Sequence, residues 1–411
     1  MAKIHYLQHA HSIGGAVISL RNLVDDALAH GHACEVTCPN DAMAGIYRGI
    51  GAAAVVRTIV GFNHTTADWY RANPYQALRG LKALARSAWS CLGWGLALRR
   101  SRPDIVHLNS STLGLYALTA KALGFAVVWH VRENVARGHL GMRRALLRML
   151  MNATADRIVC IGEKERDLIR TRPSKTDVIY NYVHIGRFQE YRPEASEQSP
   201  GAGFAALSLG GMSKIKGTST LLRTAPLLRP DEEIWIVGDA DPEGRDRYTG
   251  NAGAATGPEG ERLLERNLRV YPPCLDVRPY LFRCDVLIFW GTVPHFARPV
   301  YEAWAMGKPS IVLNTCAGGD IDGDTALLVE EDDPRILAAA LAAVRADYPS
   351  HLAKAALGRR RAALRFGEAN YERIESIYAA LTRRSGSAAS APAISGAGTS
   401  GSLSDRLKGA L

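Results

Sequence analysis

Residues 208–222 read SLGGMSKIKGTSTLL, and this stretch carries the clearest sign of how the chain folds. An apolar run ends at Leu209, two glycines follow, and Lys216 and Gly217 stand where a helical pattern begins. A strand, a glycine loop and a helix start place backbone N–H groups and a positive dipole where an anion can bind. Lys216 adds a full charge there. A solvated lysine at a helix start is an equally good interpretation of this motif alone.

Short β-type runs alternate with helical patterns on both sides of this motif. The runs lie at 4–7, 33–37, 53–58, 105–108, 127–130, 157–161 and 178–180, and then at 204–209, 234–237, 286–289 and 310–313. Strands that alternate with helices predict parallel βαβ units, and right-handed crossovers then give a doubly wound sheet. We therefore expect an α/β protein with two Rossmann-like, doubly wound domains in tandem.

Composition sets the expected boundaries. We expect a first domain over 1–190, a second over 203–365, and between them a Pro- and Gly-rich linker at 191–202, whose polar character begins near 185. A helical pattern over 366–384 predicts a closing helix that packs back on the first domain. In residues 385–402, 15 of 18 side chains are Ser, Gly or Ala, so 385–411 is expected to be a disordered tail.

The net charge of +10 is concentrated in the first half of the chain. Residues 1–190 hold 24 basic and 13 acidic side chains, whereas residues 191–411 hold 26 and 27. This asymmetry indicates an anionic partner for the first half: nucleic acid, a membrane surface or a phosphorylated substrate. The seven cysteines are scattered and form no C-x-x-C pair, which favours a reducing cytosol over a disulfide framework or a zinc site.

A second motif, FWGTVPHFARPVYEAWAMGKPSIV, covers residues 289–312. Pro299 stands where a first helical residue would be, so the N–H groups near Arg298 and Val300 are expected to face a ligand. Open α/β sheets bind nucleotides at this carboxyl edge, and Glu302, expected on the first helical turn, would accept hydrogen bonds from ribose hydroxyls. The alternatives are a helix-dipole carboxylate for Glu302 and a surface cation for Arg298.

The order of these motifs resembles the retaining glycosyltransferases of family 4, which have the GT-B fold. Their G-R-x4-K-G loop is matched at Gly210, Lys216 and Gly217, with Gly211 in place of the arginine. Of their E-x7-E pair Glu302 matches the second member, and Pro294 replaces the first. The resemblance continues through the A-x-A-x-G-x-P pattern (303–309), HSIGGAVISL (11–20), ADRIVCIGEKERDLI (155–169) and DGDTALLV (322–329).

This resemblance implies an active site in the cleft between two domains. It implies transfer of a hexose, with retention, from a nucleotide diphosphate sugar to a hydroxyl of a lipid-linked or polysaccharide acceptor. Catalytic roles fall to His130, Lys216 and Glu302, and Arg132 and Glu133 fall on the acceptor side. The expected donor-binding set is Gly14, Gly15, Gly210, Gly211, Lys214, Lys216, Tyr271, His295, Arg298, Pro299, Val300 and Glu302.

Two departures from the family pattern leave alternatives open. Lys214 or Arg298 would substitute for the arginine lost at Gly211, and His295 stands beside Pro294. No metal and no cofactor are expected, with a UDP-, GDP- or similar sugar as donor. A non-catalytic, nucleotide-sugar-binding partner subunit and a GT-B nucleotide-sugar epimerase remain as alternatives.

Two segments account for the basic excess. Residues 69–103 contain seven basic side chains and no acidic one, interleaved with tryptophan and tyrosine, and residues 140–151 set Arg143, Arg144 and Arg148 beside an apolar stripe. Basic amphipathic helices suit an anionic membrane surface, although the stripe could instead pack inward and leave the arginines solvated. No nucleic-acid-binding module is visible. We expect a cytoplasmic protein, peripheral on the inner face of the cell membrane.

Overall fold

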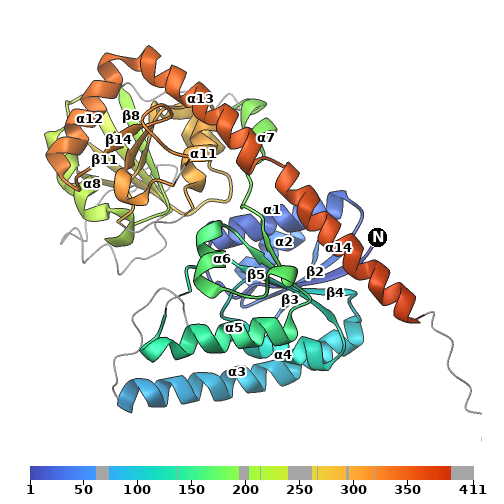
Figure 1. Ribbon diagram of the computed structural model, residues 1–411. Helices are drawn as coiled ribbons and strands as arrows, with labels where there is room; N and C mark the ends of the chain where they lie inside the picture. Colours follow the sequence, from blue (N-terminus) through green and yellow to red (C-terminus); the bar gives the residue numbers. More distant parts are fainter. Residues whose placement is uncertain are drawn as a thin grey trace, which may run out of the picture.

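The computed structural model of the chain describes residues 1–61, 74–135, 137–193, 203–212, 214–238, 262–265, 267–292, 296–318 and 320–389. These residues form two α/β domains, each built on its own sheet. The chain passes between the domains near α7 (Ile185–Gln189) and again from α13 (Tyr348–Phe366) to α14 (Ala369–Ala389) (Figure 1). The expected class, two tandem Rossmann-like domains, is confirmed.

The N-terminal sheet is entirely parallel, in the order β3-β2-β1-β4-β5-β6-β7. Its strands are β1 (Lys3–Leu7), β2 (Ala33–Cys38), β3 (Ala53–Val56), β4 (Ile105–Leu108), β5 (Ala126–Val131), β6 (Arg157–Cys160) and β7 (Thr176–Val178). All four side chains of β4 are buried, as expected for a parallel strand that helices cover on both faces.

Helices cover both faces of this sheet. They are α1 (Gly15–Ala29), α2 (Asp41–Arg48), α3 (Pro74–Ser101), α4 (Gly114–Ala122), α5 (Met142–Thr154), α6 (Glu163–Ile169) and α7 (Ile185–Gln189). One hydrophobic core lies on the side of α1 and α2, and a second lies under α3, α4 and α5. Because side chains alternate along a strand, Tyr6 faces the first core and Leu7 the second.

The C-terminal sheet runs β10-β11-β9-β8-β12-β13-β14. Its strands are β8 (Phe204–Leu209), β9 (Glu232–Val237), β10 (Arg262–Glu265), β11 (Leu268–Tyr271), β12 (Val286–Phe289), β13 (Ser310–Leu313) and β14 (Leu327–Val329). The helices are α8 (Thr218–Thr224), α10 (Arg278–Arg283), α11 (Arg298–Ala305), α12 (Pro334–Ala346), α13 (Tyr348–Phe366) and α14 (Ala369–Ala389). One continuous core holds this domain together.

The last helix returns to the N-terminal domain. Tyr371, Ile374, Ile377, Tyr378 and Leu381 of α14 are buried in the core beside α1 and β2. In Figure 1 this red helix lies across the N-terminal sheet after α13 leaves the C-terminal domain. The packing follows from the apolar spacing of three and four residues on one helix face.

Several boundaries differ from the sequence-based expectation. The helix α14 runs to Ala389, beyond the expected end of the closing helix at 384, because extending a helix already held by its buried face costs little. Residues 390–411 lie outside the described part. The polar segment from 185 opens with α7, and β10 pairs antiparallel with β11, so the second sheet is not wholly parallel.

Candidate active site

Each sheet has a topological switch point, where consecutive strands diverge to opposite sides. It lies between β1 and β4 in the N-terminal domain and between β8 and β12 in the C-terminal domain. Loops at the carboxyl ends of such strands form the ligand crevice of open α/β sheets. The candidate site is built from these loops.

The glycine loop after β8 is held by the neighbouring strand and by Lys216. The N–H groups of Gly210 and Gly211 both donate to the carbonyl of Val237 at 3.0 and 2.9 Å. Both glycines have positive φ, and a Cβ at Gly210 would lie 3.4 Å from Cε of Lys216. The lysine side chain therefore folds back over the loop, and its burial lowers the pKa of the ammonium.

Gly217 is required by a close approach to Trp290, the residue after β12. Its φ is +69°, and a Cβ there would lie 2.3 Å from the carbonyl oxygen of Trp290. The backbone N–H of Thr292 also donates to the carbonyl of Ile215 at 3.0 Å. Helix α8 begins only at Thr218, so Lys216 belongs to a 3-10 turn and not to the helix start expected from the sequence. Because the N–H groups of Gly210 and Gly211 already donate to Val237, Lys216 is the group of this loop that brings positive charge to the site.

Arg298 and Glu302 form a buried pair at the start of α11. Arg298 Nη1 lies 3.7 Å from Glu302 Oε1, and both side chains are less than a tenth exposed. Burial raises the pKa of Glu302 to about 7 against the lowering influence of Arg298. Because α11 begins at Arg298, Glu302 lies in its second turn. Neither the surface-cation nor the first-turn dipole interpretation describes these two residues.

The N-terminal domain contributes His130, Arg132 and Glu133 from the end of β5. Arg132 donates from Nε to Asn109 and from Nη1 to Asn181, both at 2.5 Å. Burial, together with the charge of Arg298, lowers the pKa of Arg132 to about 10. Glu133 is turned toward the loop after β4, where its carboxylate accepts hydrogen bonds from the Ser110 and Ser111 hydroxyls.

A small pocket between the domains brings these groups together. Ser19, Leu23, His130, Arg132, Tyr180, Asn181, Tyr182, Arg298 and Ile374 line it. Two guanidinium groups share one buried site, and such like-charge proximity stores repulsion that an anionic ligand relieves. The structure therefore joins His130, Arg132 and Arg298, which lie far apart in the sequence.

The expected donor-binding set also includes Val300, Pro299, Tyr271, His295 and Lys214, which are not among the described residues that line the pocket. The N–H of Val300 donates to the carbonyl of Ala297 at 2.9 Å, and Pro299 has no N–H, so Arg298 provides the available helix-start donor of this trio. The Tyr271 ring is buried against Trp235 and Tyr280, and its carbonyl accepts from the N–H of Gly238 at 3.2 Å. His295 and Pro294 lie outside the described residues, as does the side chain of Lys214.

Gly14 and Gly15 lie at the start of α1. A Cβ at either position meets nothing within 4 Å, so the protein itself does not require a glycine there. Gly14 is the N-cap of α1 and supplies no side-chain cap, while its carbonyl accepts from the N–H groups of Val17 and Ile18, both at 3.0 Å. This arrangement keeps room for a ligand at the N-terminal switch point.

The sequence reasoning missed three polar residues that line the pocket, Ser19, Asn181 and Tyr182, and it also missed Asn109, which accepts from Arg132. Asn109 begins a polar run directly after strand 105–108, and Asn181 and Tyr182 follow strand 176–178, so strand-end polarity was a usable signal for these three. Ser19 lies within an apolar helix and offers no comparable signal.

The described residues contain no group of three or more His, Cys, Asp or Glu side chains arranged to hold a metal ion. Asp320 and Asp322, which form a D-x-D string, accept from Arg365 at 2.5 Å and from Arg361 at 2.6 Å. Their carboxylates therefore help to hold α13 against the preceding loop.

Both domains match family models of glycosyltransferases. The family model described as Glycosyltransferase Family 4 matches residues 13–187, and the model for Glycosyl transferases group 1 matches residues 203–347. No curated protein sequence matches the chain significantly.

Solved structures share the fold at low identity. Anabaena HepE in complex with UDP-glucose has a TM-score of 0.70 at 18% identity, over 92% of this chain and 100% of that one. Sucrose-phosphate synthase from Thermosynechococcus elongatus has 0.66 at 16%, over 93% and 100%. A putative UDP-N-acetylglucosamine 2-epimerase from Listeria monocytogenes has 0.59 at 13%, over 93% and 97%.

Two doubly wound domains with a cationic pocket between them have the GT-B fold of these solved structures, and the two family models identify the chain as a glycosyltransferase. One family model accounts for each domain. The chain belongs to the family 4-like glycosyltransferases.

Proposed function

We propose that this chain is a retaining hexosyltransferase that uses a nucleotide diphosphate sugar and transfers to a hydroxyl of a lipid-linked or polysaccharide acceptor. The observation that carries this proposal is the convergence of Arg132, Arg298 and His130 at one interdomain pocket. Lys216 lies at the strand end of the same switch point in the C-terminal domain. Because HepE is seen with UDP-glucose, a UDP-sugar is the first donor to test.

The positive charges of the site suit the chemistry of glycosyl transfer. Glycosyl transfer passes through an oxocarbenium-like transition state while the leaving diphosphate gains negative charge. Cations already in place at a buried site stabilise that charge strongly, and we assign this role to Lys216 and Arg298. Arg298 thereby replaces the arginine missing at Gly211. With these cations in the site we expect no metal and no cofactor to be needed. Retention is proposed from the family.

Glu302 is assigned to the donor ribose. Because Arg298 counters the effect of burial, the pKa of Glu302 stays at about 7 and the carboxylate ionises at neutral pH, and an ionised carboxylate accepts hydrogen bonds from two hydroxyls. The Glu302 charge also influences Cys274 in the loop after β11, which places the carboxylate near that strand end.

The acceptor side is proposed to meet an anionic membrane at the inner face of the cell membrane. On α3, Trp89, Leu92 and Leu96 form one exposed stripe, and Trp89 is 80% exposed. Lys82, Arg86, Arg99 and Arg100 are exposed on the same helix. Exposed apolar side chains flanked by cations suit a headgroup region. No helix in the described part of the chain is long and apolar enough to cross a bilayer.

Helix α5 contributes less positive charge than its sequence suggested. Arg143 is buried, and Arg144 donates to the carbonyl of Val135, so Arg148 remains as the exposed cation of the three. Met142 and Met149 are exposed on the same helix, and α4 packs between α3 and α5 at this end of the domain (Figure 1).

The alternatives make different predictions. A non-catalytic partner subunit, suggested by Gly211 and Pro294, would bind a nucleotide sugar without turnover. An epimerase would convert the donor without an acceptor, and the fold alone does not separate it from a transferase because the Listeria protein shares that fold. The exposed apolar and basic face on α3 favours the transferase.

The decisive experiment offers a panel of UDP- and GDP-sugars to the full chain and measures nucleotide release with and without membrane extract. We expect release that depends on the extract. Binding of a donor without release would contradict the enzyme and favour the partner subunit, whereas an extract-independent change of the sugar would favour the epimerase.

Lys216→Ala tests the assignment of the diphosphate site. Loss of one charge-assisted contact is expected to weaken UDP binding by about 10–100-fold. Arg360→Ala, which removes an exposed cation on α13, serves as the control and should bind UDP like the wild type. Unchanged affinity of Lys216→Ala would contradict the assignment.

A further inference from the structure

A buried chain of hydrogen bonds leads from α14 to His130. The hydroxyl of Tyr6 donates to the hydroxyl of Tyr378 at 3.3 Å, and the Tyr378 hydroxyl lies 2.8 Å from Nδ1 of His107. Nε2 of His107 lies 3.2 Å from Nδ1 of His130. All four side chains are at most 3% exposed.

Strand register explains why three of these residues meet. Tyr6 pairs with His107 across β1 and β4, and His130 comes from the adjacent strand β5, on the same face of the sheet. Tyr378 comes from α14, which covers this face of the sheet.

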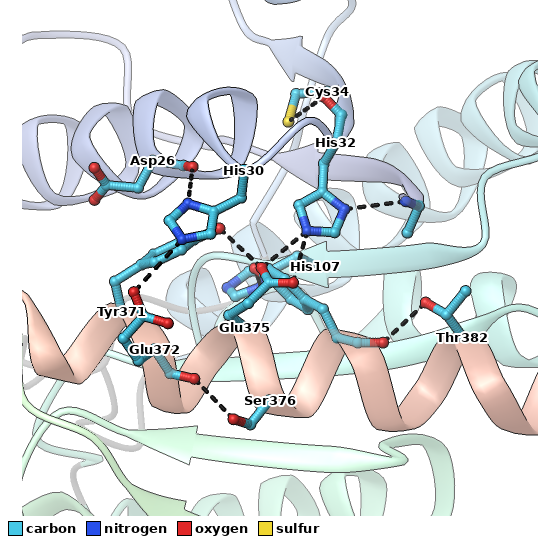
Figure 2. Close-up of polar contacts among 12 residues, drawn as sticks. Asp26, His30, His32, Cys34, His107, Tyr371, Glu372, Glu375, Ser376 and Thr382 are labelled. Carbon is cyan, nitrogen blue, oxygen red and sulfur yellow. Dashed lines mark hydrogen bonds and ion pairs between the residues drawn. The ribbon is translucent and has the colours of Figure 1, made fainter.

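Further contacts hold α14 on this face. Figure 2 shows Glu372 and Glu375 of α14 facing His30 and His32, and the His32–Glu375 contact is 2.8 Å.

Both histidines are neutral. Burial lowers the pKa of His107 to about 3, and burial together with Arg132 holds the pKa of His130 well below its usual range. Each ring therefore has one N–H and one nitrogen with a lone pair. For each hydrogen bond along the chain, one atom must then be the donor and the other the acceptor.

Arg132 favours one of the two directions. Its Nη2, always a donor, lies 3.5 Å from Nδ1 of His130, so a lone pair on that nitrogen faces the donor and an N–H there would oppose it. His107 must then donate from Nε2 to His130 and accept at Nδ1 from the Tyr378 hydroxyl. The oxygen of Tyr378 in turn accepts from Tyr6. With these directions the hydroxyls of Tyr6 and Tyr378, both ring nitrogens of His107 and Nδ1 of His130 all have a partner, as buried polar groups require.

The single proton of His130 is left on Nε2, at the end of the chain. This nitrogen is buried, and the described residues offer it no hydrogen-bond partner. His130 lines the interdomain pocket together with Arg132 and Arg298. An unpaired buried donor costs free energy until a ligand oxygen accepts from it.

We propose that Tyr378, acting through His107, is a positioning residue that fixes His130 as a neutral hydrogen-bond donor to an oxygen of the bound sugar. The identity of that ligand rests on the proposed function, whereas the tautomer does not. His130 then has no lone pair facing the pocket and does not act as a general base. The last helix of the chain thereby sets the protonation pattern of the site in the first domain.

The direct test is the tautomer of His130, read by ¹⁵N NMR on full-length protein labelled at histidine, with His130→Gln and His107→Gln for assignment. The wild type should show a protonated Nε2 and an unprotonated Nδ1. A protonated Nδ1 in the wild type would overturn the proposal without any variant.

Tyr378→Phe removes the hydroxyl and keeps the ring. The His107 Nδ1 then loses its donor, and the ¹⁵N signals of His107 and His130 should shift or split between tautomers. Tyr371→Phe is the matched control, because its hydroxyl also lies on α14 but donates to Glu375 at 3.1 Å. A Tyr378→Phe spectrum that superimposes on the wild type would refute the positioning role.

Kinetics provides a second readout. Tyr378→Phe is expected to lower kcat/KM for donor consumption about tenfold and to leave UDP affinity unchanged, because UDP lacks the transferred hexose that His130 would contact. His107→Gln, which keeps one acceptor and one donor, should retain more activity than His107→Leu. If the wild type consumes no nucleotide sugar, the proposed function fails while the NMR result still decides the tautomer.

Discussion

Arg298 of the C-terminal domain donates a 2.5 Å hydrogen bond to the hydroxyl of Ser19 in the N-terminal domain. The two residues join α11 to α1 across the cleft, and Arg132 faces the same pocket. The guanidinium is thus held by a neutral acceptor, Ser19, and by Glu302 at 3.7 Å. A negatively charged ligand would compete with Ser19 for Arg298.

This competition predicts opposite effects for the two partners. Arg298→Gln should weaken UDP binding about 10–100-fold, because a charge-assisted hydrogen bond is lost. Ser19→Ala should leave the affinity unchanged or raise it, since Arg298 no longer has to exchange one acceptor for another. Isothermal titration calorimetry measures both, with Ser376→Ala on the exposed face of α14 as control. Equal weakening by Ser19→Ala and Arg298→Gln would refute the competition.

The approach of Gly217 to Trp290 predicts a graded glycine series. Gly217→Ala combines a positive φ with a collision against Trp290 and should lower the free energy of unfolding by about 3 kcal/mol or more. Gly307→Ala has a positive φ in open space and should cost about 1 kcal/mol. Gly323→Ala has neither feature and should change stability by less than about 0.5 kcal/mol. Thermal and urea unfolding give the order, and a Gly217→Ala variant as stable as Gly323→Ala would contradict the close packing.

Burial of Glu302 predicts a pH dependence of stability. The folded chain keeps the Glu302 proton up to a pKa of about 7, whereas the unfolded chain loses it near 4.3. Between these values the folded state binds more protons, so stability falls as pH rises, by up to about 3 kcal/mol.

Glu302→Gln has no proton to lose and isolates this contribution. The Tm of the wild type should therefore fall relative to that of Glu302→Gln between pH 5 and 8, measured by thermal melts. Glu331→Gln, an exposed position, should run parallel to the wild type over the same range. Parallel curves for Glu302→Gln as well would show that the carboxyl is not buried in a protonated form.

The exposed face of α3 predicts binding to anionic lipid. A Trp89→Glu, Leu92→Glu double variant loses apolar contact and adds negative charge, so its binding to phosphatidylglycerol vesicles should fall more than about tenfold. Sedimentation with vesicles, repeated at higher salt, measures the loss. Leu364→Glu, on a leucine that is 88% exposed in the C-terminal domain, is the matched control. Equal binding of the double variant and the wild type would place the membrane contact elsewhere.

Local patterns were sufficient for the architecture. Strands such as Ile105–Leu108 and Val286–Phe289 appeared as short apolar runs, because every side chain of a central parallel strand is buried. Lys216 was also found from local spacing, since a glycine loop between a strand and a helix is contiguous in sequence. The start of α8 was misplaced by two residues because Gly217 adopts a left-handed conformation that ends the preceding turn.

Two doubly wound domains, a glycine loop and a basic first half were therefore predictable from local patterns, since each depends on the periodicity or composition of neighbouring residues. The contacts of Ser19 with Arg298 and of Tyr378 with His107 were not predictable in this way, because folding joins residues separated by 279 and 271 positions. Tertiary burial also decided the protonation of His130 and Glu302, because a pKa depends on desolvation and on nearby charges brought together by folding.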